Sequence, residues 1–262
     1  MSSVRVFVRG CWLQYVALFS WATPIGYLSY KIVLPLAQLT FFFYLGRFGG
    51  GARAASFAVL GNALQLIAIN AIYGVVQAVA IEREFGTLPI LLGSPANRAA
   101  TFLGRAFVHV LDGTFGVFLA LVVAAVLFRV DFTHADLPVL ALSVVLIALT
   151  TSGLGLAFGS LALIMRDIWV FSNTIYYLLL VLCGINFSLT LLPGWVRAIS
   201  YSIPLTRGVE AAREAVAGAS IGDVSGLLLG EVLVGAAYAA VGYALFRLLE
   251  RQARRGGLQE VA

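Results

Sequence analysis

Long apolar runs separated by short polar stretches recur along the whole chain. A transmembrane helix needs about 20 predominantly apolar residues, and several runs reach that length. Those runs cover residues 24–46, 57–81, 101–128, 138–163, 168–189 and 227–249. The pattern predicts an all-α polytopic membrane protein with six transmembrane helices. We expect the protein to form a single transmembrane domain over residues 1–262, with the six-span core at 24–250.

Two segments do not fit this scheme of spans. Residues 2–21 carry apolar side chains along one helical face with arginines at its edge, which is typical of a helix in the membrane interface. A frayed extension of the first span is the alternative. Residues 195–201 and 205–217 are each too short to cross a bilayer. They predict a broken helical hairpin on the outer face, before the last span.

Composition agrees with a membrane location. Hydrophobic residues make up 61% of the chain and charged residues 11%, whereas soluble domains are about 25% charged. The net charge of +5 comes from arginines, which near span ends are topology signals and contacts to membrane lipids rather than a nucleic-acid patch. More of them lie on the side that carries residues 82–95. We therefore expect a multi-pass protein of the cell (plasma or inner) membrane, with both termini and the tail at 251–262 in the cytoplasm.

Several kinds of site are not expected. Cys11 and Cys183 are far apart in the sequence, so neither a disulfide framework nor a metal site is predicted. A phosphate-binding P-loop needs a lysine followed by Ser or Thr, but the single lysine, Lys31, is followed by Ile32. The chain therefore has no Walker A motif, and no catalytic residue is predicted. If ATP drives its activity, another chain must hydrolyse the ATP.

A compact polar insert separates the second and third runs. Glu82, Arg83 and Glu84 are adjacent, and three charges at the centre of a membrane helix would cost roughly 8–10 kcal/mol. The insert must therefore leave the bilayer, and a plain solvated loop is one interpretation. It continues through Gly86-Thr87-Leu88 and reaches Ser94-Pro95.

That order of residue types resembles the first cytoplasmic loop of ABC-2 type permeases, the membrane subunits of ABC exporters. The Arg-Asp pair at 166–167 and the Leu-Pro-x-Trp and Ser-x-Pro-Leu-Thr patterns at 192–195 and 202–206 also resemble this family. In the family, the loop carries a short coupling helix that docks on a separate ATPase. The resemblance implies that this ATPase is contacted by Glu82, Arg83, Glu84, Gly86, Thr87, Leu88, Ser94 and Pro95.

Each part of the loop would have its own role in that contact. The charged residues would form pairs across the interface, and Leu88 would fill an apolar groove. Gly86 would permit close approach, and Ser94-Pro95 would end or turn the segment. A short helix held rigidly between two spans is suited to transmit motion.

The resemblance also implies a function and partners. The chain would be the permease subunit of an ATP-driven exporter for an amphipathic drug, natural product or lipid-like substrate. A polysaccharide or lipid-linked glycan exporter is the alternative. The chain itself would bind no cofactor, while ATP and Mg²⁺ would be bound by two copies of an ATPase subunit. A second permease subunit, identical or similar, would complete the passage.

Polar side chains inside the spans are candidates for lining that passage. Polar groups within a bilayer face a partner helix or a wet cavity, and interhelical hydrogen bonds contribute about 0.6 kcal/mol each. Both interpretations are open for the polar faces of the second and fifth spans. Their members are Asn62, Gln65, Asn70, Tyr73 and Gln77, and then Asn173 and Tyr177.

A few ionisable groups also fall within the predicted spans. Lys31 is expected to extend towards the lipid headgroups. His109 and Asp112 share one side of a helix, where they form either a proton relay, a buried pair or part of a cavity wall. Asp112 and Glu231 are the acids that an ion-driven secondary transporter would need. A membrane-embedded lipid enzyme would need a cluster of acid, base or metal-binding groups, which the sequence does not offer.

Glycines indicate two further features. Residues 47–53 are rich in glycine and are expected to form a flexible exterior loop. Gly155 and Gly159 have the small-residue spacing that lets helices approach closely. That approach would occur either within the subunit or between two subunits.

Overall fold

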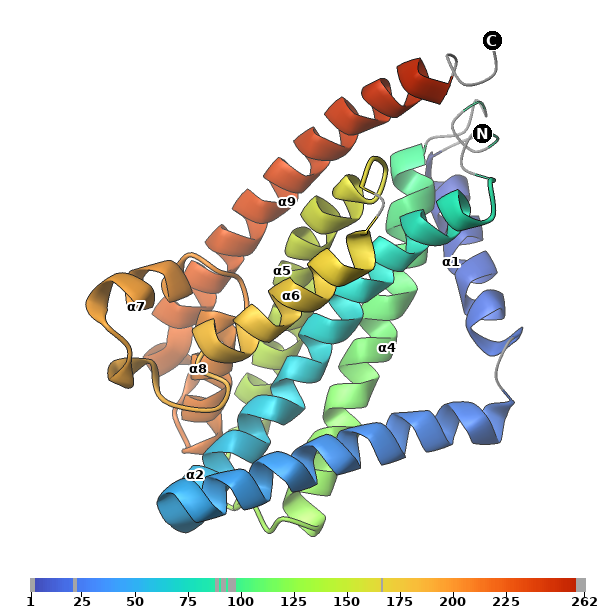
Figure 1. The fold of residues 1–262 in the computed structure, drawn as a ribbon. Coiled ribbons are helices and arrows are strands. Elements are labelled where there is room, and N and C mark those ends of the chain that lie inside the picture. Colours follow the sequence, from blue (N-terminus) through green and yellow to red (C-terminus); the bar gives the residue numbers. More distant parts are fainter. Residues whose placement is uncertain are drawn as a thin grey trace.

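The structure is a computed structural model that describes residues 3–20, 23–87, 90, 93, 98–165 and 167–257. Every regular element in these residues is a helix, so the all-α prediction is confirmed. The helices are α1 (Ser3–Ser20), α2 (Pro24–Glu84), α4 (Arg98–Val126), α5 (Leu137–Leu161), α6 (Ile168–Leu182), the 3₁₀ turn η1 (Leu189–Leu191), α7 (Gly194–Tyr201), α8 (Thr206–Val216) and α9 (Ile221–Gly257) (Figure 1).

Several of these helices are long and apolar enough to cross a membrane. They are Ile25–Glu84 within α2, Ala100–Val126 within α4, Leu137–Leu161, and Ile221–Gln252 within α9. The chain is therefore a polytopic membrane protein, as predicted. Helix α6 is apolar but has only 15 residues, which corresponds to about 22 Å of helix.

Helix α2 turns at a single residue. It has 61 residues, and inside it only Gly51, with φ 75° and ψ −160°, leaves the helical region. We call residues 24–50 the first arm and residues 52–84 the second arm; Figure 1 shows the two arms diverging from the hinge. The predicted exterior loop at 47–53 is therefore wrong. The chain can turn at this one residue because glycine accepts a positive φ without strain, and the residues on either side of it therefore stay helical.

The second arm and α5 form the centre of the bundle. Helix α5 packs against α9, the second arm, α8 and α4, while α4 packs against α1 and α2. Small residues let these helices approach, since a Cβ on Gly153 would lie 2.9 Å from the Gly235 carbonyl oxygen of α9. The core includes Val59, Leu64, Ile67, Ile72, Val117, Ala124, Val144 and Ile147.

The two ends of the bundle carry different parts of the chain. The start of α1, the end of the second arm, the start of α4, the turn after α5 and the end of α9 lie together (Figure 1). We call this the inner end. The Gly51 hinge, the 127–136 connection and helices α7 and α8 lie at the opposite end, which we call the outer end. The names follow the predicted orientation, in which both termini share one side.

The predicted broken hairpin is confirmed as helices α7 and α8. The fifth span is shorter than predicted, because α6 ends at Leu182 rather than near residue 189. Gly184, with φ 66°, turns the chain away from the helix axis. The chain then enters the hairpin through η1.

A buried acid seats the hairpin on the bundle. The Glu231 carboxylate of α9 is fully buried and accepts the backbone N–H groups of Leu205 at 2.6 Å and Gly208 at 3.0 Å. It also accepts the Thr150 hydroxyl of α5 at 2.6 Å. Since the first N–H groups of a helix lack partners within it, this carboxylate caps α8 from a different helix.

Candidate functional site

The second arm ends in a tight glycine turn at the inner end. Gly86 has φ 68°, and its N–H donates to the Arg83 carbonyl at 3.1 Å. The Thr87 N–H donates to the Glu82 carbonyl at 2.9 Å. This pair of bonds is the Schellman arrangement that terminates helices at a left-handed glycine. Gly86 therefore fixes where the insert leaves α2, and no described atom approaches its Cβ position.

The three charged residues of the insert each contact a different element. Glu82 forms an ion pair with Arg105 of α4 and accepts the Thr87 hydroxyl. Arg83 donates from Nη1 to the Met165 carbonyl at 2.6 Å, in the turn after α5.

The third charge, on Glu84, reaches the neighbouring helix α6. Its carboxylate accepts the indole N–H of Trp169 at 2.8 Å. The tip of the second arm is thus joined to α4, to the turn after α5 and to α6.

The expected contacts of the insert with an ATPase stay a prediction, beside these contacts within the chain. Glu82, Arg83 and Glu84 were expected to pair across an interface with an ATPase, and here each has a partner in its own chain. Glu84 itself is exposed and Thr87 is exposed, so both remain reachable from outside. Leu88, Ser94 and Pro95 lie outside the described residues.

Two apolar side chains of this region were not among the predicted contact residues. Phe85 is 76% exposed and Ile90 is 75% exposed, both at the inner end. Exposed apolar side chains beside a charged insert are candidates for contact with a partner protein. In the sequence, the signal was an aromatic residue placed directly between a charge triplet and a helix-ending glycine.

The polar face of the second arm is largely used for packing. Asn62 is fully buried; it accepts from the Gln38 side chain at 3.1 Å and donates to the Asn186 side chain at 2.7 Å. Gln65 is also fully buried, and neither of its amide atoms has a hydrogen-bond partner in the described part of the chain. Asn70 donates to the carbonyl of Leu66 at 2.8 Å.

The inner half of this face meets α6. The Tyr73 hydroxyl donates to Asn173 at 2.9 Å, and the Tyr73 ring stacks on Trp169 with centroids 6.4 Å apart. Asn173 and Tyr177 are both exposed, one helical turn apart on α6. Gln77 is partly buried. The structure therefore brings Tyr73, Asn173 and Trp169 together and places Asn62 and Gln65 in the core instead.

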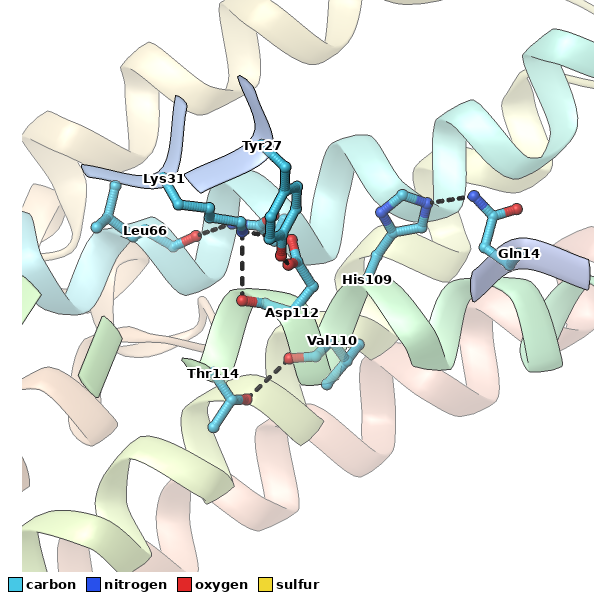
Figure 2. A network of polar contacts seen from close by, with 9 residues as sticks. Gln14, Tyr27, Lys31, Leu66, His109, Val110, Asp112 and Thr114 are labelled. Atoms are coloured by element: carbon cyan, nitrogen blue, oxygen red, sulfur yellow. Dashed lines mark hydrogen bonds and ion pairs between the residues drawn. The ribbon is translucent and has the colours of Figure 1, made fainter. Parts of the chain in front are cut away.

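An ion pair lies inside the bundle between the first arm and α4. Lys31 and Asp112 contact each other, with side chains 7% and 9% exposed, and the Tyr27 hydroxyl also donates to Asp112 (Figure 2). The expectation that Lys31 extends to the headgroups is therefore wrong. A charge in an apolar interior requires a partner of opposite sign, and Asp112 is that partner.

His109 belongs to a separate contact. Its Nε2 lies 3.0 Å from the side-chain nitrogen of Gln14 in α1, as Figure 2 shows. His109 and Asp112 lie on one side of α4 but do not form a hydrogen-bonded pair, and no relay links them in the described residues. Asp112 is paired with Lys31 and Glu231 caps α8. Both acids that an ion-driven transporter would need therefore already have structural partners.

Taken together, the features above are those of a membrane permease domain. It has an all-helical polytopic bundle, a charged turn held against three elements at one end, and a broken helical hairpin at the other. The family model for ABC-2 type transporters matches residues 3–216, and the chain belongs to that family. No curated protein matches the chain. The chain is thus a transport subunit of the ABC-2 class, whose membrane domain does not contain the ATPase.

Proposed function

We propose that this chain is the permease subunit of an ATP-driven exporter in the plasma or inner membrane. The main support comes from the tip of the second arm, where Glu82, Arg83 and Glu84 contact three different elements. ATP and Mg²⁺ are bound and consumed on two copies of a separate ATPase subunit. The cargo is an amphipathic drug, natural product or lipid-like molecule.

The contacts of the insert give it the properties of a mechanical connection. Successive helical residues point about 100° apart, so three adjacent side chains hold the tip of the arm from three directions. A displacement of the turn at 85–87 is therefore passed to α4, to the turn after α5 and to α6 at once. Phe85 and Ile90, exposed beside this turn, are the apolar surface on which the ATPase docks.

The passage is completed by a second permease subunit. The exposed residues of α6 repeat at helical spacing along one face and include Asn173 and Tyr177. Uncharged amide and phenol groups among apolar side chains suit an amphipathic cargo better than a strongly charged one. This face of α6, together with Tyr73 behind it, lines the passage between the two copies.

Co-purification of the tagged chain with its ATPase tests this function. Replacing Phe85 and Ile90 together by serine is expected to abolish recovery of a stoichiometric ATPase and to stop transport. The matched control is Phe48→Ser, since Phe48 is 90% exposed near the Gly51 hinge at the opposite end; it should leave both intact. An unchanged ATPase yield with the double variant, or transport without ATP, would contradict the proposal.

A further inference from the structure

A pocket at the outer end of the bundle has no role in the coupling contacts. Its walls are the end of α6, η1, α7 and α8, and Phe57 of the second arm also lines it. Cys183, Leu189 and Val209 are buried and supply an apolar part of the lining. The charged residues that line the pocket are Arg197, Glu210, Arg213 and Glu214.

Arg213 is held rigidly in this lining. Its Nη1 donates to the Phe57 carbonyl at 2.8 Å, and its Nη2 donates to the carbonyls of Gly184 at 3.1 Å and Ile185 at 2.9 Å. The guanidinium also lies over the Phe57 ring, 3.4 Å from its centroid. Gly61 makes the arrangement possible, because a Cβ there would overlap the Ile185 carbonyl and the Arg213 side chain.

The charge of Arg213 is only partly balanced. Burial lowers the pKa of its guanidinium to about 9, so the group remains positively charged at neutral pH. The three carbonyl oxygens that it binds carry only partial negative charge. The Arg213 Nε is buried and has no hydrogen-bond partner among the described residues. The guanidinium lines the pocket, and hydrogen bonds from a charged donor to an anion are stronger than those to neutral carbonyls.

The carboxylates of the pocket do not supply that acceptor. In the part of the chain that the structure describes, no ion pair joins Glu210 or Glu214 to Arg213 or Arg197. Glu210 instead accepts the Tyr201 hydroxyl at 3.1 Å. Glu214 and Arg197 are exposed at the rim. The pocket therefore offers two cations and two anions that do not neutralise each other, beside an apolar wall.

We propose that this pocket binds a zwitterionic headgroup that carries a phosphate and an ammonium group. The phosphate is held by Arg213 and Arg197, and the ammonium donates to Glu210 and Glu214. The apolar wall accepts the adjoining chain of an amphipathic molecule. Both a membrane phospholipid and a soluble phosphoethanolamine compound carry this chemistry. The site is independent of the ATPase coupling proposed above.

Direct binding to the full chain, purified in a nonionic maltoside detergent, tests the site. The probes are phosphoethanolamine and dihexanoylphosphatidylethanolamine, titrated by calorimetry at low salt without ATPase. Saturable binding of both probes shows that the headgroup suffices, and binding of the lipid alone assigns the site to membrane phospholipid. Binding of neither overturns the proposal. Equal binding of inorganic phosphate overturns the zwitterionic preference.

Rim variants connect binding to the named residues without disturbing the fold. Arg197→Gln and Glu214→Gln change exposed side chains. Each is expected to raise the dissociation constant roughly tenfold, as loss of one charge-assisted hydrogen bond implies. Arg53→Gln is the matched control, because Arg53 is exposed near the Gly51 hinge but does not line the pocket. Wild-type affinity in both rim variants would overturn the assignment even if the unaltered chain binds. Since this assay needs neither ATP nor transport, its failure leaves the proposed function untouched.

Discussion

The Glu231 carboxylate accepts the Leu205 backbone N–H at 2.6 Å, so an acid inside the last membrane helix holds a residue whose φ is 107°. A positive φ is unfavourable for a residue with a Cβ and persists only when surrounding contacts impose it. Here the same carboxylate also binds Gly208 and Thr150. One buried acid therefore fixes the entry of α8 into the bundle.

Glu231→Gln should destabilise the outer hairpin. The amide retains one acceptor oxygen but presents a donor to the N–H groups of α8, so we expect a loss of about 1–3 kcal/mol. Thermal unfolding of the purified chain measures this loss. Glu214→Gln is the control, since Glu214 is exposed on α8. Equal melting temperatures for the two variants would show that Glu231 does not hold α8.

The Lys31–Asp112 pair should show strong energetic coupling. Lys31→Met leaves Asp112 as an unpaired buried charge, and removing one partner of such a pair costs about 3–5 kcal/mol. Asp112→Asn does the reverse and leaves Lys31 unpaired. The double variant contains neither charge and should be more stable than the sum of the single losses predicts. A double-mutant cycle by chemical denaturation measures the coupling, and strictly additive losses would argue against a buried pair.

Arg83 should affect energy coupling more than assembly. Arg83→Met removes the bond to the Met165 carbonyl but leaves the exposed docking residues Phe85 and Ile90 in place. Substrate-stimulated ATP hydrolysis is expected to fall roughly fivefold or more, which corresponds to a typical coupling free energy, while ATPase recovery stays unchanged. Arg251→Met, at an exposed position of α9 near the inner end, is the control. A loss of ATPase recovery with Arg83→Met would instead make Arg83 a direct docking contact.

Gly155 should not tolerate even a methyl group. A Cβ at this position would overlap the Ala71 carbonyl of the second arm, and overpacking of this kind costs about 1–3 kcal/mol. Gly155→Ala should therefore lower the melting temperature. Gly226→Ala is the matched control, since no atom of the described residues lies near its Cβ position and alanine favours helix. Equal melting temperatures for the two variants would contradict the close approach of α5 and α2.

The apolar pattern predicted α5 within two residues at each end, whereas α9 extends six and eight residues beyond the predicted 227–249. Residues 138–163 were expected to form a span, and α5 covers Leu137–Leu161, because an uninterrupted apolar run ends where polar residues must leave the bilayer. The hairpin was predictable for a related reason, since its two pieces are too short to cross. Gly155 and Gly159 also behave as their spacing indicated, and both pack against the second arm within one chain.

The predictions that were wrong concern features that depend on residues distant in the sequence. The glycine-rich stretch at 47–53 offered many turning points, and only the packing of the two arms selects Gly51. The early end of α6 coincides with Gly184, and Arg213 binds the carbonyls of Gly184 and Ile185. The sequence around residue 184 does not indicate that Arg213 binds there.

The position of the candidate site could be predicted from the sequence, but the hydrogen-bond and ion-pair partners of its side chains could not. The charge triplet located the inner turn because three charges cannot remain in the bilayer. The partner of Arg83, however, is 82 residues away along the chain, and Lys31 meets Asp112 across 81 residues. Side-chain spacing along a single helix, which suggested a His109–Asp112 relay, carries no information about contacts with other helices.

Arg83 and Arg213 share a feature with a consequence for the evolution of this chain. Both guanidinium groups bind backbone carbonyl oxygens, which every amino acid possesses. Met165 and Ile185 can therefore change identity while the bond survives, whereas Gly184 has a positive φ and the Phe57 ring lies under the Arg213 guanidinium. Among homologues, the contacts to Met165 and Ile185 should leave little trace of paired substitution, and methods that infer contacts from covariation should overlook them.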